Sequence, residues 1–99
     1  MDEPPPIELP IDGTLDLHAF DPREVKELVK DYLAACRERD ILTIRIIHGK
    51  GTGALRKTVH SLLARLPEVA TFRLGGEAEG EWGATTVTLH PLRRQNSKR

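Results

Sequence analysis

The sequence predicts an α/β domain built as a two-layer sandwich, with a four-stranded mixed sheet and both helices on one face. Short β-branched or alternating runs are separated by two longer segments whose apolar residues recur at helical spacing. The resulting order is β-α-β-α-β-β. Because strand–helix–strand crossovers are right-handed, both helices should cover the same face of the sheet. A chain of 99 residues with 38% hydrophobic content can bury one core without metals or disulfides.

The predicted domain covers residues 13–92. Residues 1–12 form a leader rich in proline, which disfavours helix and favours an extended, flexible chain. Residues 93–99 form a basic tail that we also expect to be flexible. The single cysteine, Cys36, shares the apolar face of the first predicted helix. It is therefore interpreted as a core residue, and no internal disulfide can form.

The first strand and the first helix have clear local signals. Residues 14–18 alternate polar and apolar side chains, which indicates a half-buried strand with Asp16 and His18 on its outward face. Asp21 and Pro22 then favour a helix start, because aspartate caps the first turn and proline suits the first helical position. The apolar face predicted for this helix contains Val25, Leu28, Val29, Tyr32, Leu33 and Cys36.

The remaining elements follow from the same patterns. Residues 42–47 form a strand rich in β-branched side chains, and a helix runs from residue 53 or 54 to 66, where Pro67 ends it. Residues 69–74 and 84–89 form the last two strands. The core-facing residues predicted for these two strands are Ala70, Phe72, Leu74, Thr85, Val87 and Leu89.

The most distinctive stretch joins the second strand to the second helix. Glycines let a backbone approach a ligand closely, and the free N–H groups of a helix start face an anion with a favourable dipole. Between Ile41 and Pro67 there are five basic residues and no Asp or Glu, although the formal net charge of the chain is zero. We expect this stretch, which follows His48, to bind phosphate through Gly49, Lys50, Gly51, Thr52, Gly53, Arg56 and Lys57.

Three segments should meet at one edge of the sheet, beyond the carboxyl ends of the parallel strands. The first strand ends at His18, the second ends at His48, and the loop ending at Trp82 and Gly83 leads into an antiparallel strand. Trp82 and Gly83 therefore join the candidate binding residues. The two other histidines, His60 and His90, are interpreted as structural or solvated.

Several other kinds of site are not supported. The glycine loop fails the P-loop pattern, because Gly49-Lys50 is followed by Gly51 where Ser or Thr is required. A zinc site is not predicted, since there is one cysteine and no His-Glu-x-x-His pair. The chain has neither a run of about 20 apolar residues nor the features of a signal peptide, so we expect a cytoplasmic protein without membrane contact.

Asp16 and His18 are the candidates for catalysis. A histidine exchanges protons near neutral pH, and a nearby carboxylate can orient it, accept a proton or hold a divalent ion. The structural alternative is a cross-strand pair between Asp16 and Arg45, worth about 0.2–1 kcal/mol.

Together, these motifs resemble the small MutS-related (Smr) domain over residues 13–92. The matching segments are Leu15-Asp16-Leu17-His18, His48-Gly49-Lys50-Gly51 with Gly53-Ala54-Leu55-Arg56, and Gly80-Glu81-Trp82-Gly83-Ala84-Thr85. The resemblance implies a β-α-β-α-β-β sandwich and endonuclease activity on nicked or branched DNA, or on RNA, including action at ribosomes. It also implies that Asp16 and His18 are catalytic. The residues that it implies bind nucleic acid at or near the cut are His48, Gly49, Lys50 and Gly51.

The sequence departs from the family pattern at two positions. Ala19 stands where the family usually has glycine, and Glu81 replaces the second of two adjacent glycines. A negative charge from Glu81 would oppose phosphate, whereas Trp82 would either stack on an exposed base or fold onto the protein surface.

The favoured interpretation is an endonuclease in which His18 is a general acid or base. Asp16 would orient His18 or hold Mg²⁺ or Mn²⁺. The alternative is a non-catalytic module that binds nucleic acid or a ribosome through the same loop. An accessory domain whose loop binds nothing is disfavoured by the acid-free basic stretch.

Overall fold

The fold is the predicted two-layer α/β sandwich. The computed structural model describes residues 10–49, 53–75 and 83–92. Its elements, with η denoting a 3-10 helix, are β1 (Thr14–Asp16), η1 (Leu17–Ala19), η2 (Pro22–Glu24), α1 (Val25–Glu38), β2 (Thr43–Ile47), α2 (Ala54–Arg65), β3 (Val69–Leu74) and β4 (Ala84–Leu89). The predicted order β-α-β-α-β-β is confirmed. Residues 1–9 of the predicted leader (1–12) and the whole predicted tail (93–99) lie outside the described residues.

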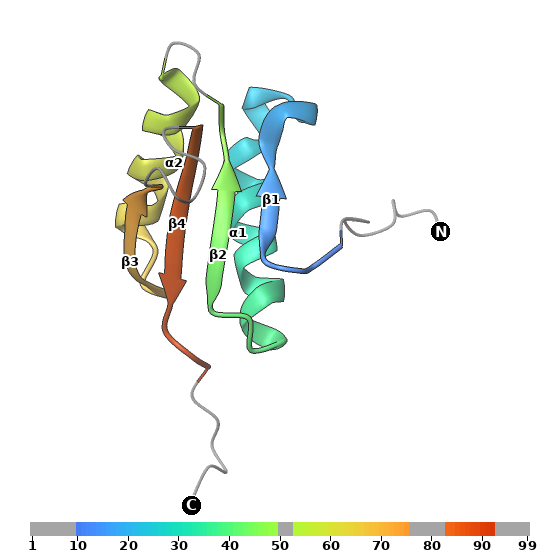
Figure 1. The fold of residues 1–99 in the computed structure, drawn as a ribbon, viewed down its shortest axis with the longest axis vertical. Helices are drawn as coiled ribbons and strands as arrows, with labels where there is room; N and C mark the ends of the chain where they lie inside the picture. The colour runs from blue at the N-terminus through green and yellow to red at the C-terminus, as the bar shows by residue number, and fades with distance from the viewer. Residues whose placement is uncertain (1–9, 50–52, 76–82, 93–99) are drawn as a thin grey trace, which may run out of the picture.

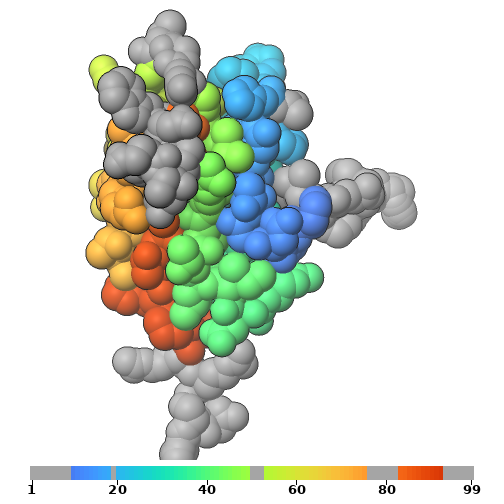
Figure 2. Space-filling model, viewed as in Figure 1, coloured from blue at the N-terminus to red at the C-terminus, as the bar shows by residue number. Residues whose placement is uncertain are grey.

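The four strands form one mixed sheet in the order β1-β2-β4-β3. β1 and β2 are parallel, whereas β4 is antiparallel to both β2 and β3. Helices α1 and α2 lie on the same face of this sheet (Figure 1). Among the described residues no helix covers the opposite face, and side chains from all four strands reach the surface there (Figure 2).

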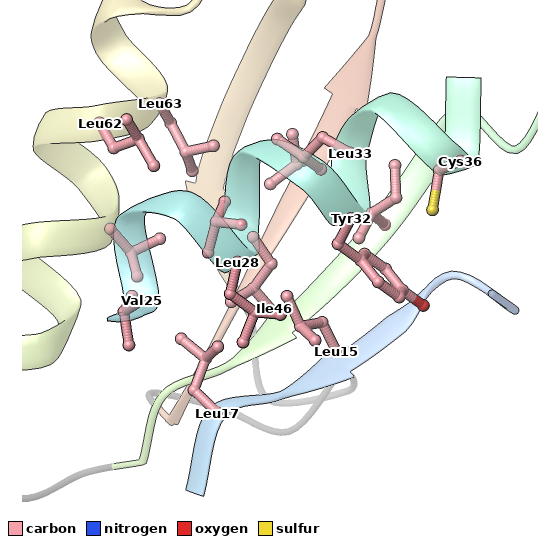
Figure 3. Close-up of a cluster of buried hydrophobic side chains, with 14 of the residues drawn as sticks. Leu15, Leu17, Val25, Leu28, Tyr32, Leu33, Cys36, Ile46, Leu62 and Leu63 are labelled. Atoms are coloured by element: carbon pink, nitrogen blue, oxygen red, sulfur yellow. The ribbon is translucent and has the colours of Figure 1, made fainter. Parts of the chain in front are cut away.

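The core lies between this sheet and the two helices. Every apolar residue predicted for the inner face of α1 is buried, including Tyr32 and Cys36 at 0% exposure. Leu62 and Leu63 of α2 lie beside the beginning of α1 near Val25 (Figure 3). The interpretation of Cys36 as a core residue is confirmed, and burial raises the pKa of its thiol.

Two local predictions need correction. The first strand ends at Asp16 and not at His18, because the Asp16 carboxylate accepts the backbone N–H of His18 and turns the chain into η1. The alternation of β3 predicts that Ala70 faces the core, but Ala70 is exposed. A β-bulge between Val69 and Thr71 places Val69 opposite Leu89, so the extra residue leaves the inward register.

One edge of the sheet gathers the segments that the sequence singled out. At this edge, named the loop edge below, β1 and β2 end and β4 and α2 begin (Figure 1). The carbonyl oxygen of Gly83 accepts the backbone N–H groups of both His48 and Gly49, at 2.8 and 2.9 Å. His90 follows the far end of β4, at the opposite edge, as expected. Within the described ranges, neither helix combines the length and apolar character needed to cross a membrane.

Tyr32 fixes the start of β1. Its hydroxyl accepts the N–H of Gly13 at 3.1 Å and lies 3.0 Å from the carbonyl of Thr14, to which it can donate. The ring is completely buried (Figure 3). The hydroxyl therefore links α1 to the strand that carries Asp16.

We expect Tyr32→Phe to lower the free energy of unfolding by about 1–3 kcal/mol, because a buried N–H and a carbonyl lose their partner. Urea unfolding measures this loss. Thr88→Val, which removes an exposed hydroxyl on the open sheet face, is the control and should change stability by less than about 0.5 kcal/mol. Equal effects of the two substitutions would contradict the linking role of Tyr32.

Candidate functional site

Asp16 and His18 form a hydrogen-bonded pair at the loop edge. Oδ1 of Asp16 lies 2.7 Å from Nδ1 of His18 and also accepts the backbone N–H of His18 at 3.0 Å. A carboxylate only accepts hydrogen bonds, so the neutral ring carries its proton on Nδ1 and leaves Nε2 unprotonated. The pair therefore presents a free basic nitrogen.

The Asp16 carboxylate is held in its charged form. The backbone N–H of His18 is the main cause that lowers the pKa of Asp16 below 3.8. Burial, the next cause, partly opposes this shift, and the hydrogen bond and charge of the His18 side chain lower the pKa further. Both side chains remain accessible, with 64% of His18 and 57% of Asp16 exposed. Arg45 lies opposite Thr14 on β1, whereas Asp16 lies opposite Ile47. Asp16 thus pairs with His18 in place of the cross-strand pair with Arg45.

Gly49 lies directly against the His18 ring. A Cβ atom at position 49 would fall 2.9 Å from Nε2 of His18, and Gly49 has a φ of +84°. Both facts favour glycine, because a side chain would displace the His18 ring and would strain the left-handed backbone. The structure therefore brings the beginning of the glycine loop to the unprotonated nitrogen of His18.

His48 is buried behind this contact, with 5% of its surface exposed. Its Nδ1 lies 3.2 Å from the carbonyl oxygen of Gly49, and its Nε2 lies 2.8 Å from Oγ1 of Thr85. Both ring nitrogens thus face protein atoms. In this arrangement His48 supports the loop from inside. That His48 binds nucleic acid remains a prediction.

Thr85 and His60 extend this support into the second helix. Thr85 is completely buried, and its Oγ1 lies 2.7 Å from Nε2 of His60. The ring of His60 also packs edge-on against Phe72, with the ring centres 5.0 Å apart. A hydrogen-bonded chain named the histidine–threonine chain, His60–Thr85–His48–Gly49, therefore connects α2, β4 and the loop.

The donor and acceptor groups set the direction of each hydrogen bond in the histidine–threonine chain. The carbonyl of Gly49 only accepts, so neutral His48 is protonated on Nδ1 and accepts the Thr85 hydroxyl on Nε2. Thr85 in turn accepts N–H from Nε2 of His60. Burial is the main cause that lowers the pKa of both histidines, and the positive charge of Arg56 acts in the same direction. Both rings are therefore neutral at pH 7.

The start of α2 lies at the far end of the glycine loop that follows β2. Gly53 has a φ of +89° and precedes the helix, and the guanidinium of Arg56 lies over it, 3.1 Å from the place of a Cβ. A surface cavity of about 250 Å³ opens here, lined by His48 and Gly49, by Gly53 to Arg56, by Thr58, and by Pro22 of η2. Lys57 is exposed in the same helical turn.

Four of the predicted binding residues, Lys50, Gly51, Thr52 and Trp82, lie outside the described residues, as does Glu81. The structure does bring together Asp16, His18, Gly49 and Gly83 at the loop edge. Among the described residues, no group of three or more His, Cys, Asp or Glu side chains is placed to hold a metal ion.

Sequence reasoning did not recognise Thr85 and His60 as part of the site. The pattern of β4 predicts that Thr85 faces the core, and a buried hydroxyl requires a hydrogen-bond partner. The need of the Thr85 hydroxyl for a buried partner was therefore the signal in the sequence, and His48 and His60 supply that partner. His60 is interpreted from the sequence as structural or solvated, and its supporting contact agrees with the structural half of that interpretation.

Comparison with known proteins identifies the family. The Smr domain model matches residues 15–90. The chain belongs to the Smr domain family, and the resemblance stated from its motifs is confirmed.

The chain is similar to bacterial endonucleases named MutS2. It is 39% identical over 79 residues to endonuclease MutS2 of Clostridium botulinum (strain Eklund 17B / Type B), and this match covers 80% of this chain. It is 44% identical over 66 residues, or 67% of the chain, to endonuclease MutS2 of Agathobacter rectalis. The chain spans about a tenth of the length of these curated relatives.

Two solved structures have a similar fold. The crystal structure of the Smr domain of Thermus thermophilus MutS2 has a TM-score of 0.76 and 35% identity, and the match covers 81% of this chain and 100% of that one. YdaL, a stand-alone small MutS-related protein from Escherichia coli, has a TM-score of 0.72 at 23% identity, covering 78% of this chain and 63% of that one. At this identity, the second likeness bears on the fold alone.

The contact between Gly49 and His18 gives a test with a matched control. We expect Gly49→Ala to displace the His18 ring, because the new Cβ would lie 2.9 Å from Nε2. Gly53→Ala introduces the same left-handed strain but meets only the flexible end of Arg56. The NMR signals of the His18 imidazole should therefore shift in the first variant and stay in place in the second. Unchanged His18 signals in folded Gly49→Ala would contradict the contact.

The histidine–threonine chain predicts an acid-sensitive fold. The folded pKa values of His48 and His60 lie below the value of 6.5 for an unperturbed histidine. As the pH falls below about 6.5, the unfolded chain takes up protons that the folded chain does not, so the free energy of unfolding decreases. Above this range both states are neutral at these positions and the contribution is complete.

His60→Gln isolates this effect, because the glutamine amide can donate to Thr85 but does not titrate. We expect a smaller loss of stability than in the wild type between about pH 7.5 and about pH 5.5, measured by urea unfolding. Identical pH profiles for the two proteins would show that His60 is not held neutral by the fold.

Proposed function

We propose that this chain is an endonuclease of the Smr type that hydrolyses phosphodiester bonds in DNA or RNA. One observation carries the proposal: Asp16 holds Nδ1 of His18, so that Nε2, the acceptor nitrogen of the neutral ring, faces the turn at Gly49. The loop that follows Gly49 leads to a basic helix start, the kind of segment that binds phosphate. A base and a phosphate holder thus adjoin at one edge of the sheet.

The proposed reaction uses His18 as a general base. Nε2 takes a proton from a water molecule, and the water oxygen forms a bond to phosphorus while the bond from phosphorus to the leaving oxygen breaks. The leaving oxygen takes up a proton, which protonated His18 can supply. The ionised carboxylate of Asp16 stabilises the imidazolium during this cycle.

The phosphate would be held by the loop and the start of α2. Backbone N–H groups from Lys50 to Gly53 and the charges of Lys50, Arg56 and Lys57 would stabilise the oxygens of the transition state. The N–H of Gly49 already donates to the carbonyl of Gly83, so Gly49 would contribute by its close approach to His18. Trp82 and Gly83 would form the neighbouring wall, with the Trp82 ring stacking on a base. His48 would keep Gly49 in place from the protein interior.

The comparisons support this proposal without establishing activity for the chain itself. The relatives that match are named endonucleases, but this chain corresponds to about a tenth of their length. The single, buried cysteine suits a reducing compartment, which favours a cytoplasmic site of action.

The alternative is a module that binds nucleic acid or a ribosome without cutting. The exposure of the catalytic pair favours it, since 64% of the His18 side chain and 57% of the Asp16 side chain remain open to water. A hydrolytic site commonly excludes bulk water when its substrate is bound. The substrate itself would have to cover His18.

Parallel measurements of nucleic-acid cleavage and binding distinguish the endonuclease from the binding module. The assay uses linear, nicked and branched DNA and structured RNA, each with and without Mg²⁺ or Mn²⁺. We expect His18→Ala to reduce cleavage by about 10²–10⁴-fold with binding preserved, because general-base catalysis contributes this much. Asp16→Asn should also reduce cleavage, since the neutral amide no longer stabilises the imidazolium. His90→Ala, at the opposite edge of the sheet, is the matched control and should cleave normally.

Binding by the wild type without any cleavage would reject the endonuclease and leave the binding module. Equal cleavage by His18→Ala and the wild type would reject the assignment of His18. If the wild type binds no nucleic acid at low salt, both functions are wrong.

A further inference from the structure

A second, basic cavity adjoins the cavity at the start of α2. It has a volume of about 260 Å³ and is lined by Lys26 of α1 and by Lys57, Thr58, Ser61, Leu62 and Arg65 of α2. Thr58 lines both cavities. The hollow surface therefore continues from the loop edge into a groove between the two helices, which we name the helix groove. Leu62 lies where α2 packs beside the beginning of α1 (Figure 3).

The lining of the helix groove is positively charged. It contains the cations Lys26, Lys57 and Arg65, two hydroxyl side chains and no carboxylate. α2 itself has no acidic residue along its 12 residues. On α1, the carboxylate of Glu27, next in sequence to Lys26, lies 3.6 Å from Nζ of Lys30. Within the described residues, no ion pair neutralises the three groove cations.

Such a groove is complementary to a chain of phosphates. Like charges gathered without a carboxylate repel one another, and a bound polyanion relieves that repulsion while releasing its own counterions. Lys57 and Arg65 are eight positions apart on α2, a distance of about 12 Å along the helix axis. The hydroxyls of Thr58 and Ser61 lie between them and can donate to phosphate oxygens.

The first cavity has a different character. Pro22, Ala54 and Leu55 give it apolar walls, and the guanidinium of Arg56 lies at its side. Apolar surface and a planar guanidinium accommodate the face of a nucleobase. A base that is paired and stacked in a duplex cannot enter a cavity, so this arrangement selects an unpaired nucleotide.

We propose that the helix groove binds the backbone of an unpaired nucleic-acid strand next to the cleavage site. The strand leaves the loop edge, places one base in the cavity between Pro22 and Leu55, and passes its phosphates along Lys26 and Arg65. This inference rests on the proposed function and adds Lys26, Ser61 and Arg65 to the binding surface. It also defines the substrate as one with a single-stranded segment beside the cut.

Salt titration of binding tests the proposal. The probe is a short fluorescein-labelled single-stranded oligonucleotide, as DNA and as RNA, measured by anisotropy with the wild-type chain. The slope of log K against log salt should become shallower by about 0.7 for each single-strand phosphate that the protein no longer neutralises. We expect such a decrease for Lys26→Gln and for Arg65→Gln, and about twice as much for the double variant. Both side chains are exposed, so folding should be preserved.

Arg39→Gln is the matched control, because it removes one exposed positive charge at the end of α1, outside both cavities. Its slope should equal that of the wild type. A fully paired duplex of the same sequence should compete poorly for the labelled single strand. Slopes for Lys26→Gln and Arg65→Gln that equal the control, or a duplex that competes equally well, would overturn the proposal.

The outcomes also distinguish this proposal from the proposed function. Wild-type cleavage or binding with unchanged slopes in the groove variants overturns the helix groove alone. Absence of any binding by the wild type at low salt overturns both.

Discussion

The absence of a side chain at Gly49 is the constraint on which the candidate site depends. A Cβ atom at position 49 would lie 2.9 Å from Nε2 of His18, so the ring can occupy its position only because this residue has no side chain. The φ of +84° at Gly49 turns the backbone away from the direction of β2. The carbonyl of Gly83 fixes the same turn from β4 by accepting two N–H groups. Sterics and hydrogen bonding thus place the beginning of the loop against the histidine that the Asp16 carboxylate orients.

The contact between Gly49 and His18 is supported by a charged group on its solvent side and by neutral groups on its interior side. On the solvent side, Asp16 stays ionised and holds the His18 ring through Nδ1. On the interior side, His48 and His60 stay neutral because burial disfavours their charged forms, and Thr85 joins them. The mixed sheet makes this possible, since β4 lies between β2 and β3 and brings Thr85 to both histidines. The Asp16–His18 pair at the surface therefore lies over a neutral, hydrogen-bonded support.

Most of the fold follows from local sequence patterns, because helical spacing and alternation report which side of each element is buried. The Asp16–His18 pair was also predictable, since its members are two positions apart. Features that depend on long-range packing were not. The bulge that exposes Ala70 is set by the register with β4, and the contact of His60 with Thr85 joins residues 25 positions apart. The sequence likewise placed His48 at the right edge but could not show that its ring points inward.

An NMR titration tests the central claim most directly, because it locates a phosphodiester at the loop edge independently of turnover. A short oligonucleotide would be added to Asp16→Asn, the variant with slowed cleavage, while the His18 imidazole and the Gly49 and Gly53 amides are observed. The account predicts that these signals shift together and saturate, whereas the imidazole of His90 at the opposite edge does not move. Shifts confined to other surfaces, with His18 and Gly49 unchanged at saturation, would contradict it.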